Sequence, residues 1–407
     1  MFLSHKVFAG LWRYSYFFPD RQKAASITLW LAMLGVAQPQ SVPADTDTPP
    51  FNTLYKWKHV DFQFPSPQHR SFAIASGFLA TRSASHIGNE GNKNDCSGLT
   101  SVFRINADSC GRLWVLDSGQ IDSQDDPEQE CPPCIVLFDL RTDRLIARYM
   151  IPKEFVLQDS LFTNIIVDTR TENCSDLHVY ITDTWRFGLL VFRQSDQKFW
   201  RFSNPLFYPD PLASNFTLHG LNFQWPDGIF GLALSPLSQF QERLLFFNSL
   251  ASYREFYVST SILQQPLRVN DSSSEFHLLG ESRGCTGQAS ASAVDRRGVM
   301  YYGLVERDSV GCWDTRKIYE KQTLGVVACN KETLIFPNDV KVDQEVQQSV
   351  WVISNRLPMF QEGPLDPDDY NYRILHADTE EAVRGTVCDP DIQQPPPTSL
   401  IQRGWLP

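Results

Sequence analysis

The stretch Phe103-Arg-Ile-Asn-Ala-Asp-Ser-Cys-Gly-Arg-Leu-Trp-Val-Leu-Asp117 contains the unit that predicts the fold. It is a β-rich run, then a polar turn with Asp and Gly, then a short aromatic strand that ends in a polar residue. Weaker copies recur along the chain, with equivalent aromatic-strand positions at Trp114, Tyr180, Leu245, Tyr301 and Trp351, in steps of 66, 65, 56 and 50 residues. Such a recurrence predicts radial repetition, in which neighbouring copies cover each other's apolar faces.

The chain is expected to be all-β and to form one propeller-like domain over residues 45–390. Five copies of the unit are visible, and the alternating segment Leu54–Leu79 is expected to begin a sixth. Closing such a ring removes the strand edges that would otherwise aggregate. Two β-sandwiches remain the alternative on pattern alone. Residues 391–407 contain Pro395–Pro397 and are expected to form an irregular tail.

Residues 1–44 have the pattern of a leader with a signal peptide. Arg21 and Lys23 precede the apolar run Ile27–Ala37, which is too short for a membrane span of about 20 residues. An uncleaved anchor is the alternative. Three glycosylation acceptors support export, at Asn173, Asn215 and Asn270. We therefore expect a secreted, extracellular protein with no membrane contact beyond the signal sequence.

The cysteines are dispersed, as in an exported protein with disulfides. There are nine of them: Cys96, Cys110, Cys131, Cys134, Cys174, Cys285, Cys312, Cys329 and Cys388. An odd number predicts at least one free thiol, and the pairing is left open because six cysteines alone allow about 15 pairings. Cys131-Pro-Pro-Cys134 resembles a redox motif, but a strand-like run follows it where a helix is needed. We predict that these two cysteines are not bonded to each other.

Charge and motifs exclude several classes of function. The net charge is −11 and the isoelectric point about 5.2, which argue against nucleic acid and anionic membrane surfaces as partners. The eight histidines show no metal-ligand spacing, and no nucleophile elbow, zinc-protease motif or phosphate loop is present. We expect neither a metal nor a cofactor.

Several segments, taken in order, resemble the yellow / major royal jelly protein family. They span Cys96 to Cys388 and include the following: Cys110–Gly119, Val136–Asp143, Arg148–Pro152, Gly228–Pro236, Glu255–Thr260, Gly311–Trp313, Phe336–Lys341 and Trp351–Leu357. The resemblance implies a six-bladed β-propeller, secretion, and roles in cuticle pigmentation, nutrition or the binding of amines.

The sequence departs from the family pattern in two respects. A Pro-Arg-Trp…Gly-x-Pro-Ala-Thr-Leu stretch of the family is missing between Phe72–Leu79 and Cys96, so we expect a truncated first blade. Six cysteines match the family, whereas Cys134, Cys285 and Cys329 are additional.

Candidate ligand-binding residues come from two sources. Alignment of the repeats places Asp117, Asp183, Asn248, Leu304 and Ser354 just after the aromatic strands. Acids that converge there are expected to bind a cation or an amine, although Asp, Asn and Ser also begin turns by bonding their own backbone. The resemblance implies a central pocket, and the residues carried over to it are Asn338, Asp339, Asn355, Leu357, Phe230 and Gln288. An aromatic residue is usual in the family at the place of Leu357.

Two functions follow as hypotheses. The first is a pigmentation or melanin-pathway protein that binds an amine- or catechol-derived small molecule in the central cavity. The second is a dopachrome-converting tautomerase or isomerase, with Asp117, Asp183 or Asp339 as the base that removes a proton beside a carbonyl. A storage role is a weaker third, since no nutrient residue is enriched.

Overall fold

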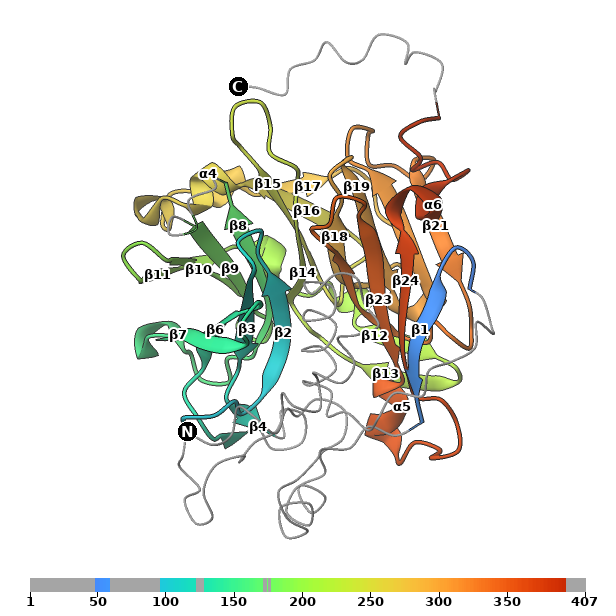
Figure 1. Ribbon diagram of the computed structural model, residues 1–407, viewed down its shortest axis with the longest axis horizontal. Helices are drawn as coiled ribbons and strands as arrows, with labels where there is room; N and C mark the ends of the chain where they lie inside the picture. The colour runs from blue at the N-terminus through green and yellow to red at the C-terminus, as the bar shows by residue number, and fades with distance from the viewer. Residues whose placement is uncertain (1–47, 59–95, 122–127, 171–173, 175–176, 393–407) are drawn as a thin grey trace.

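The computed structural model describes residues 48–58, 96–121, 128–170, 174 and 177–392. These residues form five four-stranded antiparallel sheets and two short hairpins. The first strand of each sheet lies innermost, and successive inner strands pack side by side around one axis (Figure 1). The inner strands are β2 (Val102–Ala107), β8 (Phe162–Thr169), β14 (Ile229–Leu234), β18 (Ala289–Val294) and β22 (Pro337–Val342).

The aromatic strand of the repeat is the second strand of every sheet. The five aligned positions, Trp114 to Trp351, all fall in these strands, and all are buried. The repeat alignment and the all-β propeller are therefore confirmed. The second strands are β3 (Arg112–Asp117), β9 (Leu177–Asp183), β15 (Leu244–Ser249), β19 (Val299–Leu304) and β23 (Ser349–Asn355).

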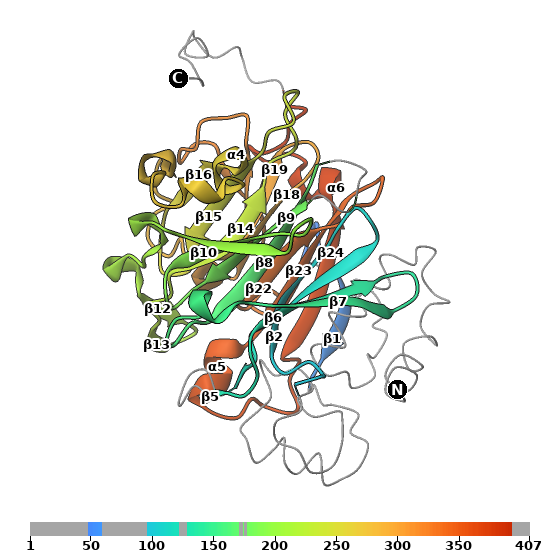
Figure 2. The same ribbon diagram turned by 90° about the vertical axis from the view of Figure 1, so that its left-hand side faces the viewer.

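The third and fourth strands complete each sheet toward the outside. In the last sheet the fourth strand is β1 (Asn52–Trp57), which pairs with β24 (Tyr372–Asp378) although the two are far apart in sequence (Figure 2). The other outer strands are β6 (Cys134–Asp139), β7 (Arg144–Met150), β10 (Gly188–Arg193), β11 (Lys198–Ser203), β16 (Glu255–Ser259), β17 (His277–Leu279), β20 (Ser309–Asp314) and β21 (Leu324–Cys329).

The expectation of six blades is wrong for the part of the chain that the structure describes, which has five. The segment expected to begin a sixth blade starts at Leu54, but this residue lies in β1 and completes the last sheet instead. Hydrogen bonds to β24 satisfy its backbone and cover an edge of that sheet. The expected truncated blade falls on residues 59–95, outside the described residues.

Each inner strand has a register shift near its start. The shifts lie between Val102 and Arg104, Phe162 and Asn164, Ile229 and Gly231, Ala289 and Ser292, and Pro337 and Asp339. A bulge leaves a residue out of the ladder and redirects nearby groups. In this structure the bulges turn backbone carbonyls toward the neighbouring sheet, where side chains bond them.

Shared apolar clusters join the sheets in sequence. One cluster links the β2 and β8 sheets, a second the β8 and β14 sheets, a third the β14 and β18 sheets, and a fourth the β18 and β22 sheets. The apolar clusters on the remaining faces of the first and last sheets contain residues of one sheet each. Among the described residues, the first and last sheets are therefore joined by polar contacts rather than by a common apolar core.

Three disulfides are present: Cys96–Cys131, Cys110–Cys174 and Cys312–Cys388. They use the six cysteines that match the family, and Cys131 is not bonded to Cys134, as predicted. Cys134 is a buried free thiol whose pKa burial raises to about 12, so it carries no reactive thiolate at neutral pH. Cys285 and Cys329 are free and exposed, so the chain has three free thiols.

The described part of the chain has three short α-helices outside the sheets: α4 (Thr260–Leu263), α5 (Leu357–Glu362) and α6 (Thr379–Val383). Among the described residues, no helix is long and apolar enough to cross a membrane. The expected leader, residues 1–44, lies outside the described residues, as does the tail from residue 393.

We expect the double variant Cys312→Ser/Cys388→Ser to lose about 3–4 kcal/mol of unfolding free energy. The disulfide ties residues 76 positions apart, and opening so long a loop restores much entropy to the unfolded chain. Urea unfolding measures the loss. The control is Cys285→Ser/Cys329→Ser, which removes two exposed free thiols and should leave stability unchanged. Equal losses of unfolding free energy in the two double variants would show that the Cys312–Cys388 disulfide does not stabilise the fold.

Candidate functional site

Arg104 of β2 lies at the centre of the candidate site, on the side of the axis where the first and last sheets meet. Its side chain is 7% exposed. The Nη2 atom donates hydrogen bonds to the backbone oxygen (2.8 Å) and Oδ1 (3.1 Å) of Asn338, and Nε lies 3.4 Å from Asp339. The guanidinium also lies 5.4 Å from the ring centroid of Phe230. Arg104 therefore gathers three of the predicted residues around one buried cation.

Asp339 is shared between two cations. Its Oδ2 faces Arg104, and its Oδ1 lies 3.5 Å from the Nζ atom of Lys341, two residues along β22. Burial lowers the pKa of Lys341, and the carboxylate of Asp339 opposes that change. One buried carboxylate thus faces two positive groups, which leaves an excess of positive charge on the axis.

The position of Arg104 over the ring of Phe230 affects which ligands could bind beside that ring. A protonated amine would be expected to sit over an aromatic face, because the ring's π-cloud attracts cations. Arg104 already holds that position over Phe230. The surroundings therefore favour a ring with carbonyl or phenolic oxygens, which accept hydrogen bonds from the guanidinium, over a second cation.

An apolar cluster adjoins Phe230 at the end of the axis where the inner strands begin. It includes Phe230, Leu357 and Phe336, together with residues of the hairpin β12 (Asn215–Leu218) and β13 (Leu221–Gln224). Asn355 is 3% exposed, and its Oδ1 accepts a hydrogen bond from the backbone N–H of Leu357. The structure thus places Asn355 and Leu357 beside the same aromatic cluster as Phe230.

Gln288 is fully buried just before β18. Its Nε2 donates a hydrogen bond of 3.2 Å to the backbone oxygen of Ala213, which anchors the loop in front of β12. Within the described residues, its side chain makes no hydrogen bond to Arg104, Asn338 or Asp339.

Asp117 and Asp183 hold their own sheets together. Asp117 accepts hydrogen bonds from the backbone N–H groups of Thr100, Ser101 and Gly119. Asp183 accepts from Ser160, Leu161 and Arg186, and it also pairs with Arg201 at 2.8 Å. The bonds from Gly119 and Arg186 are the local ones that Asp typically makes at the start of a turn. The bonds from Thr100, Ser101, Ser160 and Leu161 tie each carboxylate to the segment before its sheet's inner strand. Ligand contact by either residue stays a prediction.

A carboxyl that the sequence did not single out is Asp227, three residues before Phe230. It is half-buried, and its Oδ1 accepts a hydrogen bond of 3.0 Å from the indole N–H of Trp185. Burial raises the pKa of Asp227 to about 6, although the Trp185 bond opposes the rise. A carboxyl of this pKa can accept and return a proton near neutral pH. The turn Trp225-Pro-Asp-Gly228 was the only sequence signal for it.

Asn215 and Asn270 are exposed, as an attached glycan requires, whereas Asn173 lies outside the described residues. Among the residues that the structure covers, no cluster of three or more His, Cys, Asp or Glu side chains has metal-binding geometry.

The fold and site define a disulfide-linked β-propeller with a buried polar axis and an aromatic cluster at one end. The chain belongs to the major royal jelly protein family, whose family model matches residues 100–388. It is 44% identical to "Dopaminechrome tautomerase" of Drosophila melanogaster over 306 residues, which cover 74% of this chain and 66% of that protein, just under two thirds of its length. It is 34% identical to "Protein yellow" of Drosophila erecta over 382 residues, which cover 82% of this chain and 70% of that protein.

Solved structures match more remotely. A streptogramin B lyase structure has a TM-score of 0.37 and 10% identity, covering 62% of this chain and 61% of that chain. A likeness at this level carries no argument about function.

We expect stability to fall as pH rises from about 4 to about 6, where the unfolded chain releases the Asp227 proton and the folded protein keeps it. Its folded pKa of about 6 lies above the unfolded value of about 4, so its contribution is complete below pH 4 and is lost as pH rises through 6. Relative to the parent, Asp227→Asn should therefore gain about 2 kcal/mol between pH 4 and pH 7.5. Denaturant unfolding at both pH values measures this, with the exposed Asp368→Asn as control. A pH-independent difference would show that Asp227 is not desolvated.

Proposed function

We propose that this protein acts in the melanin pathway on an aminochrome, the cyclised quinone form of a catecholamine, and isomerises it at the axial site around Arg104. The observation that carries the proposal is the 44% identity with a dopaminechrome tautomerase. The buried, aromatic-walled guanidinium supports it, since a neutral quinone offers oxygens to Arg104 and brings no competing positive charge.

The chemistry of such an isomerisation needs two groups from the protein. In each shift a proton leaves a ring carbon and a proton arrives on a quinone oxygen, and two such shifts give the isomeric dihydroxyindole, so nothing is oxidised or reduced overall. Arg104 would stabilise the negative charge that grows on the oxygen, and a buried cation is effective there because water does not screen it. A carboxyl with a pKa near neutral would remove the carbon-bound proton, and Asp227 has that property.

Of the bases expected from sequence, Asp339 lies on the axis, but two cations hold its carboxylate. Both oxygens of that carboxylate are therefore engaged within the protein. Asp117 and Asp183 are engaged by loop backbone. Asp227 stands three residues before Phe230, its side chain accepts a hydrogen bond from Trp185, and its pKa is near neutral, so in this proposal we assign it the role of base.

The proposal predicts that the purified chain accelerates the decay of dopaminechrome, followed by the loss of its visible colour. Arg104→Met should lower kcat/KM by on the order of 100-fold, the scale seen when one charge-stabilising donor is removed. Arg104→Lys should recover part of the loss, and the exposed Arg254→Met serves as control. Near-UV circular dichroism checks folding of each variant. A folded Arg104→Met protein with full activity would refute this role.

The same assay tests Asp227. The parent's kcat should rise with pH through about 6 as the carboxyl ionises, and Asp227→Asn should lose that rise together with most of kcat. An unchanged pH profile in Asp227→Asn would assign the proton transfer to another group.

The apolar cluster beside Asn355 favours a second candidate, the binding of an aromatic amine without turnover. The similarity to "Protein yellow" supports this candidate, because it covers 82% of the chain, against 74% for the tautomerase. Dopamine binding without dopaminechrome turnover would support it. In that case Asn355→Ala should weaken dopamine binding by about 1–3 kcal/mol, the cost of leaving a buried polar partner unsatisfied. Calorimetric titration measures the change, and unchanged affinity in a folded variant would exclude Asn355 from the site.

A further inference from the structure

A second site lies on the axis at the opposite end from Phe230, where the inner strands finish. It is a cavity of about 150 Å³. All five inner strands contribute to its wall, so it is formed by the ring and not by one sheet. The polar or charged lining residues that the argument uses are Arg243, Lys341, Ser292, Thr169 and Asp108.

The charges around this cavity do not balance. Lys341 shares Asp339 with Arg104, and Arg243 shares Asp168 with Arg170. Asp108, the acid in the wall, is already paired with Arg112 at 2.7 Å. In the wall itself two cations, Arg243 and Lys341, meet one carboxylate, Asp108, and Arg112 already pairs with that carboxylate. An unpaired charge removed from water is costly, and a bound anion would relieve that cost.

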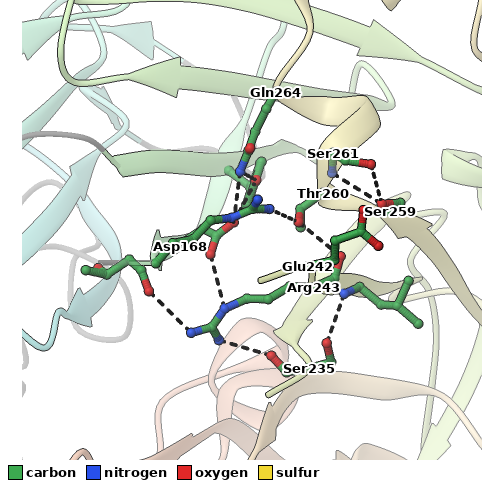
Figure 3. A network of polar contacts seen from close by, with 12 residues as sticks. Asp168, Ser235, Glu242, Arg243, Ser259, Thr260, Ser261 and Gln264 are labelled. Atoms are coloured by element: carbon green, nitrogen blue, oxygen red, sulfur yellow. Dashed lines mark hydrogen bonds and ion pairs between the residues drawn. The ribbon is translucent and has the colours of Figure 1, made fainter. Parts of the chain in front are cut away.

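Arg243 is held in place by a fixed network (Figure 3). Its Nη1 and Nη2 atoms donate to the backbone oxygens of Ser235 (3.0 Å) and Thr169 (3.3 Å), and its Nε lies 3.2 Å from Asp168. Gln264 and Tyr180 donate to the other oxygen of Asp168. The guanidinium is therefore oriented before any ligand arrives, which reduces the ordering cost of binding.

The cavity wall also contains a hydroxyl without a partner. Ser292 of β18 is 3% exposed, and its Oγ makes no hydrogen bond among the described residues. A buried hydroxyl without a partner is unfavourable, and native structures rarely leave one so. A ligand oxygen in the cavity would supply the missing bond.

We propose that this cavity binds a small aromatic carboxylate, with the carboxylate between Arg243 and Lys341 and an oxygen bonded to Ser292. Size supports a single ring, since a cavity of about 150 Å³ holds a benzene molecule in another protein. Part of the wall is apolar, from Ile166, Leu232 and Val342, and would contact a ring. The site is separate from the aminochrome proposal, and direct binding tests it whether or not the protein turns over dopaminechrome.

The test is calorimetric titration of the purified full chain with benzoate, in a buffer low in chloride. Benzamide is the matched control ligand, because it has the same ring and size without the charge. We expect benzoate to bind with one-to-one stoichiometry and a Kd on the order of a millimolar or lower, and benzamide to bind at least 10-fold more weakly. Equal binding of the two ligands would overturn the proposal, as would no binding of benzoate.

Variants locate the binding. Lys341→Met keeps the length of the side chain and removes its charge, and should weaken benzoate at least 10-fold; Lys198→Met, at an exposed lysine of β11, should not change it. Ser292→Ala removes a hydroxyl that has no partner in the protein, so it should fold normally and weaken benzoate several-fold. Full benzoate affinity in folded Ser292→Ala and Lys341→Met proteins would place the anion elsewhere and overturn the proposal.

Discussion

The buried contact of Arg104 with Asn338 and Asp339 is the interaction on which the described arrangement of sheets depends. Four of the contacts between successive sheets are made by shared apolar clusters, but the first and last sheets share none among the described residues. A ring of sheets is stable only if each sheet is covered on both sides. At this junction a cation supplies hydrogen bonds and an ion pair in place of apolar contact. The same side chain borders the aromatic cluster, so the structural closure and the candidate site coincide.

The bulges explain how the remaining sheets are held at the axis. A bulged residue leaves the ladder, and its neighbourhood offers a carbonyl that the sheet itself does not use. Side chains from adjacent sheets bond these carbonyls: Asn164 to Phe230, Asn248 to Ala289, and Ser290 to Pro337. Arg104 makes the corresponding bond to Asn338. The polar side chains near the axis thus serve first to form hydrogen bonds with backbone groups. Only side chains with a further unused donor or acceptor are available to a ligand.

The sequence predicts the second strand of each sheet well, because a buried aromatic strand that ends in a polar residue is a local pattern. Trp114 and Trp351 are found where the repeat places them. It could not predict that β1 joins β24, since pairing between segments some 300 residues apart leaves no local mark. The bulges were equally hidden, and so was Arg104, a single cation within a β-rich run. Position alone selected Asp117 and Asp183, but only the structure shows that loop backbone already occupies their carboxylates.

The placement of charge along the axis gives its two ends different chemistry. Toward the start of the inner strands, the ring of Phe230 lies beside the guanidinium of Arg104 and adjoins an apolar cluster, which suits a planar neutral molecule with oxygens. At their finish, two fixed cations and a free hydroxyl surround a small cavity, which suits an anion. Asp339 connects the two ends because Arg104 and Lys341 both depend on it for charge compensation. In a medium of low dielectric constant, a charge that compensates one of these cations changes the electrostatic free energy of the other. The electrostatics of the two ends are therefore not independent, and Asp339 is the group through which they are coupled.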